Sequence, residues 1–423
     1  MTASAASLRD QYLAVRQQTQ NLIKALSPED MVPQSMPDAS PIKWHLGHTT
    51  WFFETFLLRN HVPQYTLFDD SFPHLFNSYY ESAGTRYARP QRGLLTRPAL
   101  EEVMRYRARV DDEMLRLLAR ENSDIDSLVT VGLHHEMQHQ ELMLTDLLHL
   151  MSHNPTFPTA FGDAVKISPT RSGGRTPEGP IKLDMIVRED NLIRVGALSD
   201  EFSYDCERPS HKTYLGPHAL ANRLVTNGEW LQFMADNGYK EPLLWLSDGW
   251  VLCKSEGWEA PLYWVEKEGE WFQFGLDGLQ KIDINAPVCH ISYFEAEAYA
   301  RWAGKRLPRE HELEHAASAE AITGNFVEQE QWRPKEAQGS AGEIHQLYGD
   351  VWEWTQSAYL PYPKFSPENG ALGEYNGKFM VNQFVLKGGS CATPTLQMRS
   401  SYRNFFYPHQ RWQFSGVRLA EDL

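Results

Sequence analysis

The chain reads His134-His135-Glu136-Met137-Gln138-His139-Gln140-Glu141 inside a long segment, residues 124–153, whose apolar side chains repeat with the period of a helix. His135 and His139 are four residues apart, so their imidazoles lie on one face of that helix, about one turn apart. Two neutral imidazoles in this arrangement can bind one transition metal ion, and imidazole suits Zn, Fe, Cu and Ni. The stretch therefore predicts a metal-binding helix and leaves the metal open.

The same stretch satisfies the pattern H-E-x-x-H, in which two histidines bind zinc and the glutamate is the general base of a metalloprotease. Such an enzyme needs a third zinc ligand. The extended form of the pattern places a glycine and a histidine where this chain has Leu142 and Thr145. No glutamate on a following helix is available before the linker described below, so the sequence argues against a metalloprotease.

Glu141 suggests another interpretation, a facial triad of two histidines and one carboxylate that binds non-haem Fe(II). A helix turns by about 100° per residue, so Glu141 points roughly 200° away from His139. A third ligand is better sought on a facing helix, because helix bundles build metal sites in this way. His45 and His48 are the candidates. The spacing leaves open which of them faces the pair, and whether both only pack locally.

Length and composition limit the remaining possibilities. The chain has 423 residues, of which 42% are hydrophobic, and this length suggests two or three domains. Its formal net charge of −15 argues against a nucleic-acid partner, which would need clustered Lys and Arg. No basic segment followed by an apolar one opens the chain, and no window approaches about 18 uninterrupted apolar residues. We therefore expect a cytoplasmic enzyme without a membrane partner.

Hydrophobic periodicity predicts a helical first part. Four long segments carry it, and four helices of this length suggest a four-helix bundle. The connection between the second and third segments, residues 61–98, is long and rich in Phe, Tyr and Arg. Loops of this length are often functional. The four segments are residues 8–26, 41–59, 100–120 and 124–153.

A polar run rich in Pro, Gly and Ser, residues 166–180, predicts a linker. Beyond it, runs are short and turn signals dense, with two clear helices at residues 225–237 and 293–303. The sequence therefore predicts an α+β multidomain protein. Its parts are a helical bundle over residues 1–165, the linker, and a domain of short strands and loops over residues 181–423.

The pattern as a whole resembles a known family. The N-terminal segment SPIKWHLGHTTWFFETF, residues 40–56, followed by HHEMQHQE, resembles the DinB-like four-helix bundle of the ergothioneine-pathway sulfoxide synthases. The C-terminal part resembles the formylglycine-generating-enzyme-like fold, a C-type-lectin-like variant, that these enzymes carry. The resemblance covers nearly all of the chain. The matching C-terminal segments are residues 224–231, 287–292, 302–308, 349–354, 387–390 and 415–419.

The resemblance implies an iron-dependent oxidoreductase of ergothioneine biosynthesis. Members of the family join a thiol, cysteine or γ-glutamylcysteine, to C2 of the hercynine imidazole, using O2 and non-haem Fe(II), and leave a sulfoxide. A selenium donor on the same scaffold, giving selenoneine, is an alternative. A zinc-dependent DinB-type thiol transferase and a non-catalytic ligand-binding module are the others. The residues do not distinguish between sulfur and selenium, or between the two thiols, and they do not indicate the oligomeric state.

The resemblance also implies an iron site and one substrate contact. Its iron ligands would be His48, His135 and His139, and Gln138 would hydrogen-bond the substrate imidazole. Without the resemblance, Gln138 would be taken for an exposed helical residue.

Four further residues correspond to substrate contacts in the family. Asn404 and Phe405 would receive the trimethylammonium end of hercynine, which aromatic faces and dipoles can hold. Arg89 and Arg92 would bind the donor's carboxylate, because a guanidinium pairs with a carboxylate in a bidentate way. Taken alone, Asn404 and Phe405 are compatible with core structure, and the two arginines with surface charge.

The catalytic tyrosine differs between two branches of the family. One branch places it shortly before the Gly-Gly-Ser motif, but here residues 378–384 contain no Tyr. That branch also has an Asp where this chain has Phe406. The pair Tyr79-Tyr80 resembles the second branch, in which the N-terminal loop supplies the acid. The sequence does not choose between the two tyrosines.

Overall fold

The computed structural model describes residues 7–120, 123–162, 181–198, 202–340 and 342–423. The predicted linker, residues 166–180, lies outside the described residues. The chain divides into two compact units. The first contains residues 1–161 and a short later segment, residues 369–375, and the second contains residues 162–368 and 376–423.

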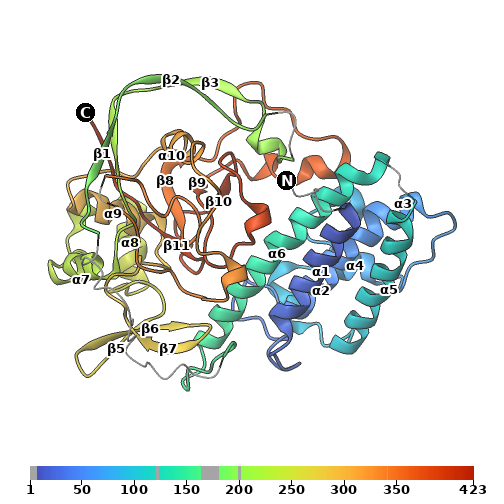
Figure 1. The fold of residues 1–423 in the computed structure, drawn as a ribbon. Helices are drawn as coiled ribbons and strands as arrows, with labels where there is room; N and C mark the ends of the chain where they lie inside the picture. Colours follow the sequence, from blue (N-terminus) through green and yellow to red (C-terminus); the bar gives the residue numbers. More distant parts are fainter. Residues whose placement is uncertain (1–6, 121–122, 163–180, 199–201, 341) are drawn as a thin grey trace. The chain divides into compact units, whose positions relative to one another are not determined.

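The first unit is built on four helices that lie beside one another in Figure 1. The four periodic segments of the sequence are confirmed as helices. After α2 the backbone passes through a π-helical turn, Glu54–Leu58, into the short α3, Arg59–His61. The four helices are α1 Leu8–Ile23, α2 Ile42–Phe53, α5 Leu100–Leu118 and α6 Asp126–Ser152.

Helix α2 lies at the centre of this unit, since all of its residues are buried. Close packing around it depends on glycine. A Cβ at Gly47 would lie 2.3 Å from the ring of Phe76, and one at Gly132 of α6 would lie 2.6 Å from the ring of Phe53. These two glycines let aromatic rings approach the backbones of α2 and α6.

The long connection after α3 is ordered by short helices and by the later segment of the chain. It contains α4, Phe72–Phe76, and the 3₁₀ turns Glu81–Ala83 and Arg89–Leu94. The backbone N–H groups of Glu81 and Ser82 each donate to the Glu374 carboxylate at 3.0 Å. These bonds attach residues 369–375 to the first unit.

The second unit contains short strands, which agrees with the α+β expectation. Its largest sheet has the order β10-β9-β8-β11, with β11 parallel to β8 and the other neighbours antiparallel. These strands are β8 Trp352–Ala358, β9 Phe384–Lys387, β10 Asn404–Phe406 and β11 Ser415–Gly416.

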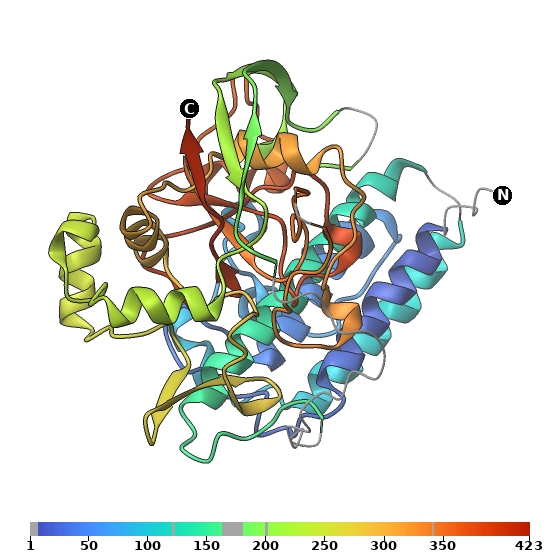
Figure 2. The same ribbon diagram turned by 60° about the vertical axis from the view of Figure 1, so that its left-hand side comes forward.

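Three smaller sheets complete the strands of this unit, and Figure 2 shows the β5-β6-β7 sheet apart from the others. The strand orders are β1-β4-β12, β2-β3 and β5-β6-β7. The strands are β1 Met185–Arg188, β2 Asn191–Val195, β3 His211–Leu215, β4 His218–Ala221, β5 Trp264–Lys267, β6 Glu270–Gly275, β7 Gly278–Lys281 and β12 Ala420–Asp422.

Both predicted helices of the second unit are confirmed, as α7 Asn227–Ala235 and α9 Tyr293–Trp302. The sequence missed α8, Ser247–Ser255, and α10, Glu310–Ala317. Helix α10 reads EHELEHAA and buries three glutamates together with one leucine and two alanines, so its apolar face is small.

Two further observations concern the whole chain. All four cysteines are buried, and none is in a disulfide. In the described ranges, no helix is both long enough and apolar enough to cross a bilayer.

Candidate metal centre

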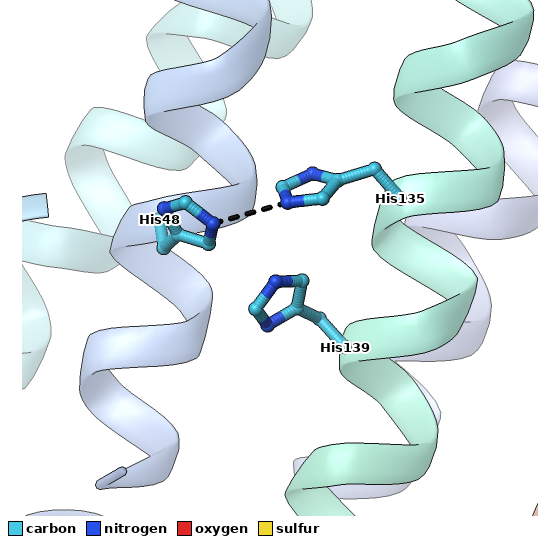
Figure 3. A group of neighbouring side chains, drawn as sticks. All are labelled: His48, His135 and His139. Carbon is cyan, nitrogen blue, oxygen red and sulfur yellow. Dashed lines mark hydrogen bonds between the residues drawn. The ribbon is translucent and has the colours of Figure 1, made fainter. Parts of the chain in front are cut away.

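Three buried imidazoles meet between α2 and α6. His48 comes from α2, and His135 and His139 come from successive turns of α6 (Figure 3). One ring nitrogen from each lies within 4.8 Å of the other two. The Nε2 atoms of His48 and His135 are 3.0 Å apart. The facing helices therefore bring together three nitrogen atoms around one point.

The hydrogen bonds of His48 fit a metal ion at that point. Its Nδ1–H donates to the carbonyl oxygen of Phe76 at 2.6 Å, which leaves a lone pair on Nε2. That lone pair faces Nε2 of His135, and a cation bound between the rings would use both nitrogens. Three imidazoles of this kind suit a borderline metal such as Fe(II) or Zn(II).

The protonation of the three rings also fits metal binding. Burial lowers the pKa of His135 to about 3. Burial, followed by the charge of His135, lowers the pKa values of His48 and His139 well below their usual range. At neutral pH all three rings are therefore neutral, which is the form that binds metals.

His45 does not belong to this cluster. Its Nδ1 lies 2.8 Å from Nδ1 of His139, and its Nε2 lies 3.0 Å from the carboxylate of Asp146. Of the two candidates that spacing left open, His48 lies in the three-histidine cluster and His45 does not, and the role of His48 as a metal ligand stays a prediction.

Glu136 is not available as the general base of a metalloprotease. Its carboxylate is fully buried and accepts hydrogen bonds from Arg16, Arg107 and Thr19. Burial opposes its ionisation, but Arg107 and Arg16 together hold its pKa at about 2. Glu136 therefore anchors α1, α5 and α6 to one another. Glu141 is half-buried and is not part of the three-histidine cluster.

Tyr79 and Tyr80 lie in the same unit, close to the cluster. Their rings stack with centroids 4.8 Å apart. The ring of Tyr80 lies 5.6 Å from that of Trp51, which in turn stacks on His48 at 5.5 Å. Burial raises the pKa of Tyr79, so its hydroxyl keeps its proton at neutral pH.

A third tyrosine near the cluster, Tyr375, was missed by the sequence analysis. Its ring lies 5.9 Å from that of His135 and 6.1 Å from that of Tyr79. Its hydroxyl donates to the side-chain oxygen of Gln138. Tyr375 precedes by only three residues the stretch 378–384, which contains no Tyr. Its place in the first unit leaves no signal in the local sequence.

Arg92 and Arg89 occupy different environments. Arg92 is buried, with its guanidinium 3.4 Å from the centre of the Trp44 ring, and it donates to the hydroxyl of Ser40 at 2.9 Å. Burial, and then the charge of Arg89, lower its pKa. Arg92 has no carboxylate within ion-pair distance in the described part of the chain. Arg89 is exposed and donates to the backbone carbonyl of Asp38.

Comparison with known proteins decides the family. The DinB superfamily matches residues 11–154, and the sulfatase-modifying factor enzyme 1-like domain matches residues 179–341 and 334–423. Hercynine oxygenase of Mycobacterium tuberculosis is 33% identical, with 92% of each chain covered. Hercynine oxygenase of Mycolicibacterium smegmatis is 31% identical, with 99% of each covered. The chain belongs to the hercynine oxygenase family.

A third relative has a different length. Ergothioneine biosynthesis protein 1 of Schizosaccharomyces pombe is 28% identical over 52% of this chain and 28% of that protein. The family predicted from the sequence is thus confirmed, and so is its combination of a helical part with a strand-rich part.

In this hercynine oxygenase family member, Asn404 and Phe405 belong to the second unit. Both are half-buried on β10. The side-chain oxygen of Asn404 accepts from the backbone N–H of Phe405 at 2.9 Å, and the ring of Phe405 stacks on that of Tyr359 at 4.1 Å. Their contact with hercynine stays a prediction.

Proposed function

We propose that this chain is an Fe(II)- and O2-dependent enzyme that joins the sulfur of cysteine or γ-glutamylcysteine to C2 of the hercynine imidazole. The observation that carries the proposal is the buried three-histidine cluster in a chain of the hercynine oxygenase family. The reaction balances without another reductant. The thiol and the C2 position each lose one hydrogen, one oxygen atom of O2 becomes the sulfoxide oxygen, and the other leaves as water.

His48, His135 and His139 would hold the iron, which, when bound, activates O2 and favours the thiolate form of the donor. Three neutral protein ligands leave up to three positions for substrates. Because the rings come from two helices packed against each other, their geometry is set by the fold and not by the ligand.

Gln138 and the tyrosines would act on the substrates. Gln138 is next to His139 in sequence, its side-chain oxygen accepts a hydrogen bond from Tyr375, and its amide would hydrogen-bond the hercynine imidazole. The hydroxyl of Tyr79 or Tyr80 would act as a general acid and donate a proton to oxygen while O2 is reduced. Tyr375 is a further candidate for this role because of its distance from His135.

Charge complementarity supports a donor that carries a carboxylate. Arg92 is a buried cation on the aromatic face of Trp44, and a bound carboxylate would neutralise it. Arg89 would contribute a second guanidinium from the surface. By their correspondence to the family, we propose that Asn404 and Phe405 receive the trimethylammonium group of hercynine by dipole and cation–π attraction.

The function is tested by reconstituting the chain with Fe(II) without oxygen, and then adding O2 and hercynine. Cysteine, γ-glutamylcysteine and a selenosugar are supplied in separate reactions, and product masses are read out. We expect a sulfoxide with one of the two thiols. Product from the selenosugar alone would favour selenoneine synthesis. Thiol transfer with Zn(II) and without O2 would favour the transferase, and binding without turnover would favour a ligand-binding module.

The tyrosines are tested by product distribution. The double variant Tyr79→Phe/Tyr80→Phe loses two hydroxyls while keeping the stacked rings, so we expect the sulfoxide yield to fall by about 10²–10⁴-fold, as for loss of a general acid. Simple oxidation of the thiol would then dominate. Tyr375→Phe is compared in parallel. An unchanged ratio of sulfoxide to disulfide in the double variant would remove Tyr79 and Tyr80 from this role.

A further inference from the structure

His45 is a buried imidazole close to the metal centre that the proposed reaction does not use. It lies on α2 one turn before His48, and it is only 2% exposed. Spacing had made it a candidate ligand, but the structure places it behind His139 rather than beside the other ligands.

A chain of short contacts connects His139 to a carboxylate through His45. Nδ1 of His139 lies 2.8 Å from Nδ1 of His45, and Nε2 of His45 lies 3.0 Å from Oδ2 of Asp146. The backbone N–H of Ser40 donates to the same Oδ2 at 2.8 Å. His45, His139, Asp146 and Ser40 are all buried.

The ring nitrogen that carries the proton in His45 and in His139 follows from which atoms can donate and which can accept hydrogen bonds. Oδ2 of Asp146 also accepts from the backbone N–H of Ser40 and acts as an acceptor here, so Nε2 of His45 carries the hydrogen in that bond. A neutral His45 then has a lone pair on Nδ1, which accepts a hydrogen bond from Nδ1–H of His139. The remaining nitrogen of His139, Nε2, is left with its lone pair. This is the tautomer of His139 that can bind a metal through Nε2.

We propose that Asp146 and His45 form a positioning relay that fixes the tautomer and ring orientation of His139 for metal binding. The inference rests on the metal centre of the proposed function, and His45 acts through His139 without touching the ion. A carboxylate often orients a metal-bound histidine directly. Here a second imidazole is placed between them.

The other two histidines of the cluster are oriented differently. His48 is fixed by the backbone carbonyl of Phe76, which no side-chain substitution removes. Nδ1 of His135 makes no hydrogen bond to any described residue, and its ring packs against that of Phe52 at 4.8 Å. His139 is therefore the ligand whose Nδ1 is held by another side chain.

Matched variants separate the hydrogen bond from packing. His45→Leu removes the acceptor for His139 but keeps an apolar side chain, whereas His45→Asn places an amide oxygen near the position of Nδ1. Asp146→Leu removes the far end of the relay. Asp146→Asn keeps an oxygen that can accept both bonds, since both end on Oδ2. Circular dichroism of each full-length variant checks that the helices are formed.

The first readout is the tautomer of His139 in the metal-free chain, from the ring ¹⁵N shifts of protein labelled at histidine. The second is the dissociation constant for Fe(II), measured without oxygen against a chromogenic chelator. We expect His139 to carry its proton on Nδ1 in the unsubstituted chain. His45→Leu and Asp146→Leu should each weaken Fe(II) binding by about 10–100-fold, as loss of such supporting groups does. The two Asn variants should stay within a few fold of the unsubstituted chain.

Several results would overturn the relay. One is a proton on Nε2 of His139 in the unsubstituted chain, whatever its metal affinity. Another is unchanged Fe(II) affinity in His45→Leu. A loss in His45→Leu without a loss in Asp146→Leu would show that His45 acts by packing alone. Neither readout involves hercynine or O2, so failure of the oxygenase reaction would not be mistaken for failure of the relay.

Discussion

The two units of this chain bury their charges differently. In the first unit, the carboxylate of Glu136 forms ion pairs with both Arg16 and Arg107. This network joins the three long helices α1, α5 and α6. In the second unit, buried pairs join short elements far apart in the sequence, as Arg399 does with Glu207 and Arg418 with Glu353. Long helices thus order the metal centre, whereas scattered ion pairs order the domain of short strands.

Carboxylates at the N-termini of two helices in the second unit also form ion pairs with arginines. Glu229 of α7 and Glu295 of α9 close capping boxes, and each also pairs with an arginine, Arg223 or Arg411. Each carboxylate therefore satisfies a helix N-terminus and also pairs with an arginine, which is close in sequence for Glu229 and distant for Glu295. We expect substitutions at the metal centre and in the second unit to have separate effects.

The largest expected effect is on the metal centre. His48→Ala removes one of three ligands and leaves a buried gap, so we expect Fe(II) affinity to fall by more than about 1,000-fold, below detection at micromolar metal. Hydrogen exchange of peptides from the second unit should be unchanged. Full metal occupancy in this variant, measured by elemental analysis, would contradict the assignment of His48.

The next effect is on the second unit and depends on pH. Glu207→Gln leaves the half-buried Arg399 without its counter-ion, which should cost up to about 3–5 kcal/mol of unfolding free energy, the range for a fully buried pair. Burial opposes the ionisation of Glu207, but Arg399 holds its pKa below the usual value. Because the folded pKa is lowered, the pair stabilises fully above the ordinary pKa of about 4.3 and is lost as pH falls through the folded value.

Denaturant unfolding between pH 3 and pH 7, with exchange measured on peptides around residues 205–207 and 399–401, tests this expectation. In the Glu207→Gln variant, the change in the free energy of unfolding between pH 3 and pH 7 should be smaller by the contribution of about one titrating proton. Arg116→Ala is the control, because the Arg116 guanidinium that pairs with the half-buried Glu113 in α5 is exposed, and the pair should contribute less than about 0.5 kcal/mol. Equal losses in the two variants would remove the contrast between buried and exposed pairs.

The smallest effect concerns packing beside the ligand. Gly47→Ala forces the ring of Phe76 to move, and the carbonyl of Phe76 accepts from His48. Overpacking should cost about 1–3 kcal/mol, partly offset by the better helix propensity of Ala. Fe(II) affinity should fall by a few fold. Gly216→Ala, where a Cβ meets nothing within 4 Å, is the control, and an equal thermal shift in both variants would count against this packing effect.

The features that were predicted correctly from the sequence are those that follow from hydrophobic periodicity. The four helices of the first unit and the shared face of His135 and His139 follow from a repeat of about 3.6 residues. The choice between His45 and His48 did not follow from spacing, because both lie on a helix that is buried all round. The relay through Asp146 was also invisible, since it joins α6 to a residue about one hundred positions earlier.

Long-range pairing explains what the sequence could not predict. Helix α10 buries its glutamates because arginine and lysine partners come from other segments, such as Lys387 for Glu314 and Arg403 for Glu310. Tyr375 reaches the first unit because the backbone of Glu81 and Ser82 holds Glu374. These long-range contacts produce no periodic pattern in the sequence, so they could not be predicted from it.

The position of Tyr375 in the chain affects the order in which the site is completed during synthesis. All three histidines are contained in the first 161 residues, whereas Tyr375 is translated more than 200 residues later. At about 5–20 residues per second, this is a delay of roughly 10–40 s. The three histidines of the bundle are therefore all synthesised well before Tyr375, which takes its place beside His135 and Gln138.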